Sequence, residues 1–392
     1  MTSTNPVDAV AEPVHGLIVD ANPVRLWGMS STERLHRSLR LVGVKAVETE
    51  SDHRAAAARL PPQCRVVIVS DDWVFDMALI RDLAARRDGV VLIDAVDGMA
   101  VAANVAAAQV DAARAALAGS KTALPDAARL TPEQLSGAYN HQLRKRQTPY
   151  LLRLTPASLP AIEALMFGAS YKGVTDVVTK YVWPRPARYV TRVCAELKVT
   201  PNQVTLLSLV LTLWSFWLFW NGHYALGLAS GWLMTFLDTV DGKLARVTLT
   251  YSKFGDIFDH GIDLIHPPFW WWAWVVGLPA YGTPLSADDA EWILAVILVG
   301  YVLQRVLEGA FINLFDMHMH VWRRFDSQFR LWTARRNPNL LILTPAVALG
   351  RPDLGIELVA LWTALSLAVH ALQIVQGLFA RRHGPLESWL RQ

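Results

Sequence analysis

The chain has 392 residues, of which 53% are hydrophobic and 16 are tryptophan, more than an ordinary soluble domain carries. The formal net charge is only +3, and no basic patch alternates with aromatic residues, so the sequence does not support a nucleic-acid partner. Cys64 and Cys194 provide neither a disulfide framework nor zinc-ligand spacing. The first residues lack the basic and apolar segments of a cleavable signal peptide, so we expect a cytoplasmic start.

Residues 1–165 mix apolar and charged stretches as a cytosolic domain does. The pattern predicts strands near residues 15–20, 65–70 and 90–94, and helices at 31–41, 76–86 and 100–119. Strands that alternate with helices favour a Rossmann-like α/β domain with a parallel sheet.

Residues 166–200 connect this domain to the apolar half of the chain. Within them, residues 171–197 are expected to be helical and to lie at the membrane surface, because aromatic residues alternate there with lysines and arginines. We therefore predict an interfacial juxtamembrane helix.

Residues 201–392 contain long apolar runs typical of an all-α transmembrane bundle. Six spans are predicted, near residues 203–220, 224–241, 256–278, 291–315, 338–350 and 354–379. The fifth is short for a crossing helix, so a start near Leu331 with kinks at Pro338 and Pro345 is one alternative. Lysine and arginine collect in alternate loops, which predicts a multi-pass protein with both termini on the cytoplasmic side.

Four aspartates fall at helical spacing on two of these predicted spans. Asp238 and Asp241 share one face of the second span, and Asp259 and Asp263 share one face of the third. An ionised aspartate in a membrane costs roughly 2.5–3.5 kcal/mol on insertion scales, so four of them require partners. All-oxygen ligands favour Mg²⁺ or Mn²⁺, and four carboxylates suffice for two ions that assist a phosphoryl displacement. Arg246 is suited to contacts with phosphate oxygens.

The spacing of these residues resembles the signature of the CDP-alcohol phosphotransferase family, Asp-x₂-Asp-Gly-x₂-Ala-Arg-x₈-Gly-x₃-Asp-x₃-Asp, at residues 238–263. The resemblance implies a membrane transferase of phospholipid synthesis that uses a CDP-alcohol donor, an alcohol acceptor and divalent metal, and it implies a homodimer. Its implied metal ligands are Asp238, Asp241 and Asp259, while Asp263 either completes the ligands or acts as the base. The implied nucleotide pocket is formed by Asn202, Gly242, Ala245, Arg246 and Gly255.

The substrates and the base are less defined by these residues. His260 is a rival general base, or it merely hydrogen-bonds a ligand carboxylate. Asp241-Gly-Lys243 resembles the branch that uses a soluble CDP-alcohol with a lipid acceptor, which we prefer slightly to CDP-diacylglycerol with a soluble acceptor. The run from His266 to Trp272 is expected to form a helix kink and a lipid-facing aromatic surface.

The N-terminal domain loosely resembles a sugar nucleotidyltransferase fold. The similarity lies in the segments at residues 16–20 and 66–72, but Ala21-Asn-Pro-Val replaces the glycine-rich loop that would cradle phosphates. We therefore expect an inactive or regulatory remnant rather than an active cytidylyltransferase. Asp71 and Asp72 are either its former metal carboxylates or simply the end of a strand.

Two other functional classes deserve comparison with phosphotransfer. Buried acids also mark ion pathways in transporters, but these aspartates lie near one interface and no inverted repeat is visible. A non-catalytic membrane scaffold is the third class, and the complete signature argues against it.

Overall fold

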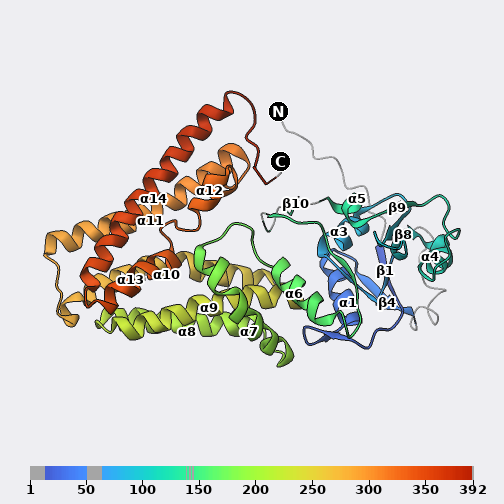
Figure 1. Ribbon diagram of the computed structural model, residues 1–392, viewed down its shortest axis with the longest axis horizontal. Coiled ribbons are helices and arrows are strands. Elements are labelled where there is room, and N and C mark those ends of the chain that lie inside the picture. The colour runs from blue at the N-terminus through green and yellow to red at the C-terminus, as the bar shows by residue number, and fades with distance from the viewer. Residues whose placement is uncertain (1–13, 51–63, 138, 141–142, 144, 391–392) are drawn as a thin grey trace. The chain divides into compact units, whose positions relative to one another are not determined.

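The computed structural model describes residues 14–50, 64–137, 139–140, 143 and 145–390. These residues divide into two compact units, one comprising Met1–Tyr139 and Gln147–Met166, the other Asn140–Arg146 and Phe167–Gln392. The first unit is an α/β domain and the second is helical (Figure 1).

The first unit is built on a six-stranded sheet with the order β4-β1-β5-β8-β7-β9. Its strands are β1 (Val14–Val19), β4 (Ala46–Thr49), β5 (Arg65–Ser70), β7 (Val90–Ile93), β8 (Ala100–Ala106) and β9 (Ala128–Leu130). Shorter strands of this unit form separate pairs: β2 (Arg25–Leu26) with β3 (Met29–Ser30), and β6 (Trp73–Phe75) with β12 (Leu151–Arg153). A further pair, β10 (Tyr139–Asn140) with β11 (Lys145–Arg146), belongs almost entirely to the second unit. The helices of the first unit are α1 (Ser31–Leu41), α3 (Met77–Ala85), η1 (Ala107–Gln109), α4 (Val110–Leu117), α5 (Pro132–Ser136) and most of α6 (Leu159–Ala169).

Side chains cover the sheet on both faces. Leu35 and Leu39 of α1, with Leu79 of α3, belong to one buried cluster. Ala113 and Ala116 of α4 belong to a second buried cluster. All six residues of β5 are buried, as expected for a central strand that both layers cover.

The predicted parallel sheet is wrong in one respect, because the sheet is mixed. β1 is parallel to β4 and β5, but β8 is antiparallel to both β5 and β7. The predicted helix at residues 100–119 therefore fails over its first third, where β8 lies. Residues 94–99 form the turn between β7 and β8, with Gly98 at φ +70°, and the alanines that follow obscured the turn signal of Asp97-Gly98. Pairing on both sides then outweighs the helical propensity of alanine.

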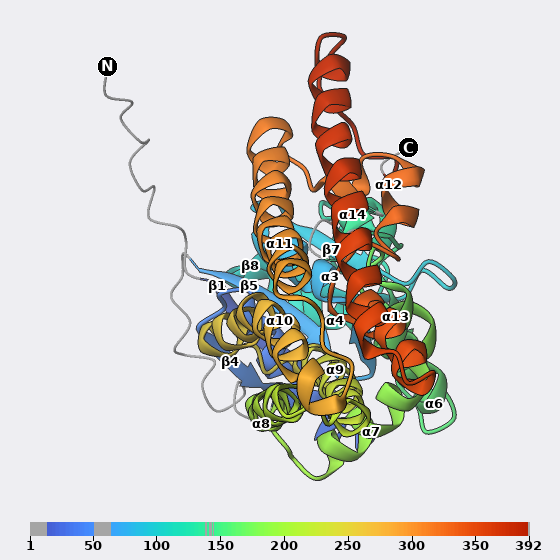
Figure 2. The same cartoon turned by 90° about the vertical axis from the view of Figure 1, so that its left-hand side faces the viewer.

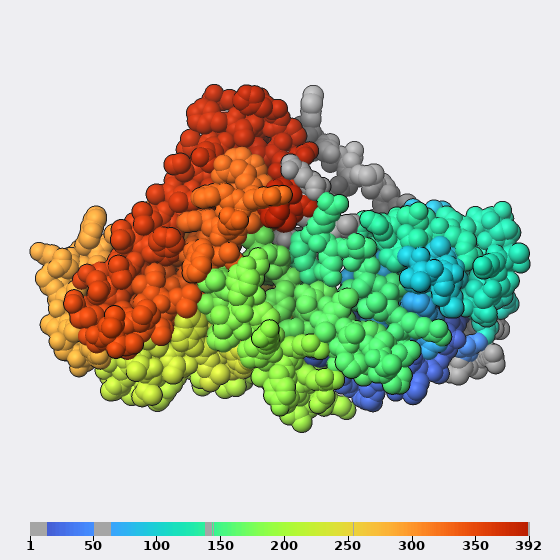
Figure 3. All heavy atoms as spheres, viewed as in Figure 1, coloured from blue at the N-terminus to red at the C-terminus, as the bar shows by residue number. Residues whose placement is uncertain are grey.

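The second unit contains the helices of the apolar half. They are η2 (Val178–Val182), α7 (Pro184–Glu196), α8 (Pro201–Trp220), α9 (Tyr224–Thr248), α10 (Lys253–Tyr281), α11 (Ala287–Phe315), η3 (Met319–Val321), α12 (Arg324–Phe329), α13 (Arg336–Ala348) and α14 (Pro352–Arg381). α8 packs along α9, and their yellow-green surfaces adjoin in Figure 3. α11 and α14 run side by side (Figures 1 and 2).

The structure places a helix at each of the six predicted spans. Among the described residues, three of these helices are long and apolar enough to cross a membrane: α8, α11 and α14. α9 and α10 carry the charged residues of the signature, and α13 has only 13 residues. α13 begins at Arg336, so the alternative start near Leu331 is wrong. The six-span topology therefore stays a prediction.

The contact between α8 and α10 depends on aromatic residues and one glycine. Trp270 and Trp274 of α10 are fully buried beside Phe219 of α8. Gly277 lies against the backbone at the end of α8, where an added Cβ would overlap the carbonyl oxygen of Phe219. The predicted lipid-facing surface is thus half wrong, because Trp270 and Trp271 are buried whereas Phe269 and Trp272 are exposed.

Candidate functional site

The first site element is the start of α8. Thr200 caps this helix in a reciprocal capping box with Gln203, and Pro201 occupies its first turn. Asn202 follows immediately and is exposed. This capped start places the Asn202 side chain against the start of α10, because an added Cβ on Gly255 would lie 2.6 Å from the Asn202 Oδ1.

The signature residues occupy the end of α9 and the start of α10. α9 ends at Leu249, whose φ of +54° reverses the chain, and α10 begins after Ser252, whose hydroxyl accepts a hydrogen bond from the Gly255 N–H at 2.9 Å. This short connection makes the two helices neighbours at their signature ends. The glycines face protein atoms here: Gly255 lies against Asn202, and the Gly242 carbonyl accepts a hydrogen bond from Arg246 Nη1 at 3.1 Å. Ala245 lies on the same turn as Arg246 and is half-buried.

Three of the four predicted carboxylates come together. Asp238 and Asp241 of α9 and Asp259 of α10 each offer an oxygen, and these oxygens lie within 4.8 Å of one another. Asp241 is 3% exposed, and its Oδ2 accepts a hydrogen bond from the Thr205 hydroxyl at 2.6 Å. The site therefore joins α8, α9 and α10.

The second oxygen of Asp241 indicates that a cation fits this site. The Asp241 Oδ1 is buried and has no hydrogen-bond partner among the described residues. A buried carboxylate oxygen is costly without a donor or a cation, and hard divalent ions prefer such all-oxygen surroundings. The residues present are therefore compatible with Mg²⁺ or Mn²⁺.

The fourth carboxylate, Asp263, pairs with an arginine that lies outside the signature. Arg336, at the start of α13, donates to Asp263 Oδ1 at 2.5 Å and to Asp238 Oδ2 at 2.6 Å. In the sequence, Arg336 is one of several basic residues before the fifth span and counts only toward topology. Only the packing of α13 against α9 gives it a role at the site.

His260 is exposed and lies at the edge of the cluster. Its Nδ1 is 2.9 Å from the Asp256 carbonyl oxygen and 4.0 Å from Asp259 Oδ2. The ring is therefore beside a candidate ligand without being inside the group of three carboxylates.

Lys243 is expected from the sequence to be a basic loop residue and to distinguish two family branches, but it lies within α9 and is buried. Its ammonium group donates to the Ser170 carbonyl oxygen at 3.3 Å and lies 3.5 Å from the centre of the Tyr171 ring. These contacts tie the juxtamembrane segment to the signature helix.

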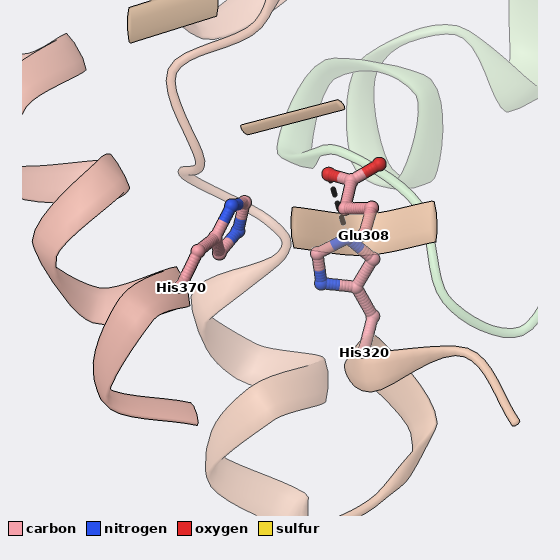
Figure 4. Close-up of side chains that lie close together, drawn as sticks. All are labelled: Glu308, His320 and His370. Carbon is pink, nitrogen blue, oxygen red and sulfur yellow. Dashed lines mark hydrogen bonds and ion pairs between the residues drawn. The ribbon is translucent and has the colours of Figure 1, made fainter. Parts of the chain in front are cut away.

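A second ionisable cluster joins α11, η3 and α14. Glu308, His320 and His370 each direct a side-chain ligand atom toward a common point, as Figure 4 shows. Arg335 binds both oxygens of Glu308 at 2.5 and 2.6 Å, and Arg305 lies 3.1 Å from it. Burial lowers the pKa of His320 well below its usual value, so its ring is neutral at physiological pH.

The charges of this second cluster argue against a divalent cation. Two guanidinium groups already neutralise Glu308, so a further cation would add repulsion in a poorly solvated place. Several buried donors have no partner among the described residues, including Arg305 Nε and Arg335 Nε. Unsatisfied positive donors of this kind fit an oxyanion better than a metal ion. We refer below to Glu308, His320, His370, Arg305 and Arg335 as the arginine–histidine cluster.

Comparison with known proteins agrees with this geometry. Residues 198–370 match the family model described as CDP-alcohol phosphatidyltransferase. This part of the chain is a CDP-alcohol phosphatidyltransferase domain. It contains both the acidic cluster and the arginine–histidine cluster. The three long apolar helices and the family match together indicate a membrane protein with a transferase domain of phospholipid synthesis.

A relative of this domain is the archaetidylinositol phosphate synthase of Pyrococcus horikoshii. The two sequences are 26% identical over 186 residues, which cover 45% of this chain and 84% of the relative.

The N-terminal unit has a polar edge at the ends of β1 and β5. Asp71 is fully buried and accepts hydrogen bonds from the Thr32 hydroxyl at 2.7 Å and from the Asn22 N–H at 3.2 Å. The Asn22 amide donates to Asp72 Oδ1 at 2.9 Å and to the Leu154 carbonyl at 3.0 Å. Asn22, which belongs to the segment that replaces the expected glycine-rich loop, is thus used to tie strand ends together.

Proposed function

We propose that the CDP-alcohol phosphatidyltransferase domain transfers a phospho-alcohol group from a CDP-alcohol to an acceptor hydroxyl and releases CMP. The acceptor oxygen forms a bond to the phosphorus next to the donor alcohol, and the bond from that phosphorus to the CMP oxygen breaks. The observation that carries this proposal is the meeting of Asp238, Asp241 and Asp259, with one buried oxygen that has no partner among the described residues.

Asp238, Asp241 and Asp259 would hold the divalent metal, and Asp263 is the nearest further carboxylate for a second ion. When bound, such ions neutralise the pyrophosphate and stabilise the charge that develops on it. Arg246 turns from the Gly242 carbonyl toward the phosphates, since a guanidinium binds phosphate oxygens in a bidentate manner. Asn202, Gly242, Ala245 and Gly255 are proposed to line the cytidine side of the pocket.

Either Asp263 or His260 removes the proton from the acceptor hydroxyl. Asp263 is favoured by its position, because Arg336 bridges it to Asp238 at the acidic cluster. The His260 Nδ1 is instead engaged with the Asp256 carbonyl. A CMP-release assay of Asp263→Asn and His260→Gln distinguishes the two candidate bases, and the greater loss is expected in Asp263→Asn. A greater loss in His260→Gln would reverse this assignment.

We propose a CDP-lipid donor and a phosphorylated polyol acceptor. This is the alternative to the soluble CDP-alcohol donor and lipid acceptor that the sequence around Lys243 favours. Two observations support it: the relative is named for a lipid that carries inositol phosphate, and the arginine–histidine cluster offers unsatisfied donors suited to a second phosphate. In the cluster, Arg305 and Arg335 would bind that phosphate.

The experiment is a donor and acceptor screen with the full-length chain in detergent, measuring CMP release with Mg²⁺ or Mn²⁺. CMP is expected from CDP-diacylglycerol when inositol phosphate is present. Release from CDP-ethanolamine, CDP-choline or CDP-inositol with diacylglycerol would instead support a soluble donor. No metal-dependent CMP from any pair would contradict the transferase assignment itself.

The membrane arrangement is also a proposal. Six crossings with both termini and the site on the cytoplasmic side agree with the loop charges, and the family resemblance implies a homodimer. Labelling from the outer side of single cysteines introduced at the exposed positions 221 and 286 tests the topology, and light scattering of the purified protein tests the homodimer. Labelling only from the cytoplasmic side would contradict this topology.

The N-terminal unit is proposed to be an inactive remnant. Replacement of Asp72 by Asn is expected to leave CMP release within about twofold of the wild-type rate. The Asp72 carboxylate already accepts a hydrogen bond from Asn22, and Asp72 lies in the N-terminal unit, whereas the acidic cluster lies in the helical unit. The same preparation should consume no CTP in the presence of phospho-alcohols. CTP consumption that Asp72→Asn abolishes would show an active cytidylyltransferase.

A further inference from the structure

Arg336 bridges the two helices that carry the acidic cluster. Its side chain is only 12% exposed, and its two terminal nitrogens pair separately with Asp238 of α9 and Asp263 of α10. Its Nε is buried without a hydrogen-bond partner among the described residues. The side chain is therefore committed to these two carboxylates.

The backbone that carries Arg336 is held by its neighbours. Asn337 donates to Asp176 Oδ1 at 2.9 Å, and the Val177 N–H donates to the Leu331 carbonyl at 3.0 Å. Burial alone would raise the pKa of Asp176, but the Thr179 N–H, the nearby Arg330 and Asn337 hold its pKa below the usual value. The ionised Asp176 thus anchors the start of α13.

The charge balance at the cluster makes Arg336 a competitor of metal ions. Within the described part of the chain, Arg336 forms ion pairs with two of the four signature aspartates, Asp238 and Asp263. A divalent ion bound to Asp238 would share that carboxylate with the guanidinium, and two cations so close repel each other. The same guanidinium draws Asp263 away from the group formed by Asp238, Asp241 and Asp259.

We propose that Arg336 is an internal counter-cation that competes with divalent metal for Asp238 and Asp263. It stabilises the metal-free domain, and it must release at least Asp263 before a second ion can use that carboxylate. This inference rests on the proposed metal site, and it assigns to Arg336 a positioning role that the signature does not contain.

The test is Mn²⁺ binding to the full-length protein, followed by the EPR signal of free Mn²⁺ and by thermal unfolding in detergent. Arg336→Gln is expected to bind Mn²⁺ at least about tenfold more tightly than the wild type, because a positive charge leaves the ligand carboxylates. Its unfolding temperature should fall without metal and recover more strongly when Mn²⁺ is added.

Arg351→Gln is the matched control, since Arg351 is exposed and pairs with Asp353 away from the cluster; its Mn²⁺ binding should equal that of the wild type. If Arg336→Gln does not fold, Arg336→Lys, which can no longer bridge both carboxylates, should show the same change to a smaller extent. Unchanged or weaker Mn²⁺ binding in the variant that folds would overturn the competition. Absence of Mn²⁺ binding in the wild type would instead refute the metal site, so the two failures are distinguishable.

Discussion

Replacement of Asp241 by Asn is expected to lower metal-dependent CMP release on the order of a thousandfold or more. The loss follows because Asp241 is the most buried member of the acidic cluster, and a neutral amide cannot hold a divalent ion that contributes several kcal/mol to phosphoryl transfer. Thr205 can still donate to the amide oxygen, so the local packing is retained. The measurement is CMP release over a range of Mg²⁺ concentrations.

Stability separates this loss of function from misfolding. The metal-free Asp241→Asn protein is expected to gain about 1 kcal/mol, because a buried amide costs less than a buried carboxylate. Asp288→Asn is the control: Asp288 lies in the first turn of α11, is exposed, and should leave CMP release unchanged. Full activity of Asp241→Asn, or equal losses in both variants, would remove the basis of the metal assignment.

Replacement of Gly277 by Ala is expected to destabilise the helical unit by about 3 kcal/mol. The added methyl group would overlap the Phe219 carbonyl and would come within 2.9 Å of the Gly222 nitrogen, and backbone atoms cannot move aside as a flexible side chain can. The distortion would separate α8 from α10 and so move Asn202 away from Gly255. Thermal unfolding in detergent, with the folded fraction measured by size-exclusion chromatography, provides the readout.

Gly309 on α11 is the matched control for this substitution. A Cβ added there meets no neighbouring atom within 4 Å in the part of the chain that the structure describes. Because alanine also favours a helix over glycine, Gly309→Ala should be neutral or slightly stabilising. A folded yield of Gly277→Ala equal to that of Gly309→Ala would show that α8 and α10 do not depend on their close approach.

Local signals predicted the elements of the N-terminal unit well where they were unambiguous. The helix at residues 31–41 and the strand at 65–70 match the observed α1 and β5, because a serine cap and a continuous β-branched run specify them. β8 was missed because its alanines suit a helix, and only its neighbours β5 and β7 make it a strand. Strand direction likewise depends on long-range pairing.

The candidate site was predictable only as far as helical spacing extends. Spacing alone placed Asp238 with Asp241 and Asp259 with Asp263 on common faces, and the structure brings three of these four together. Arg336 could not be found in this way, since it lies 98 and 73 residues from its two partners. The buried roles of Lys243 and His370 also result from tertiary packing rather than from a local pattern.

The distance in sequence between the aspartates and Arg336 has a consequence for biosynthesis. The ribosome delivers α9 and α10 well before it delivers α13, so a nascent chain carries its four carboxylates while their guanidinium partner is still untranslated. During that interval, protons, water or ions have to compensate the acidic side chains. Maturation of the site is therefore completed only when the last helices emerge, and a chain truncated before residue 336 would leave its acidic residues without that partner.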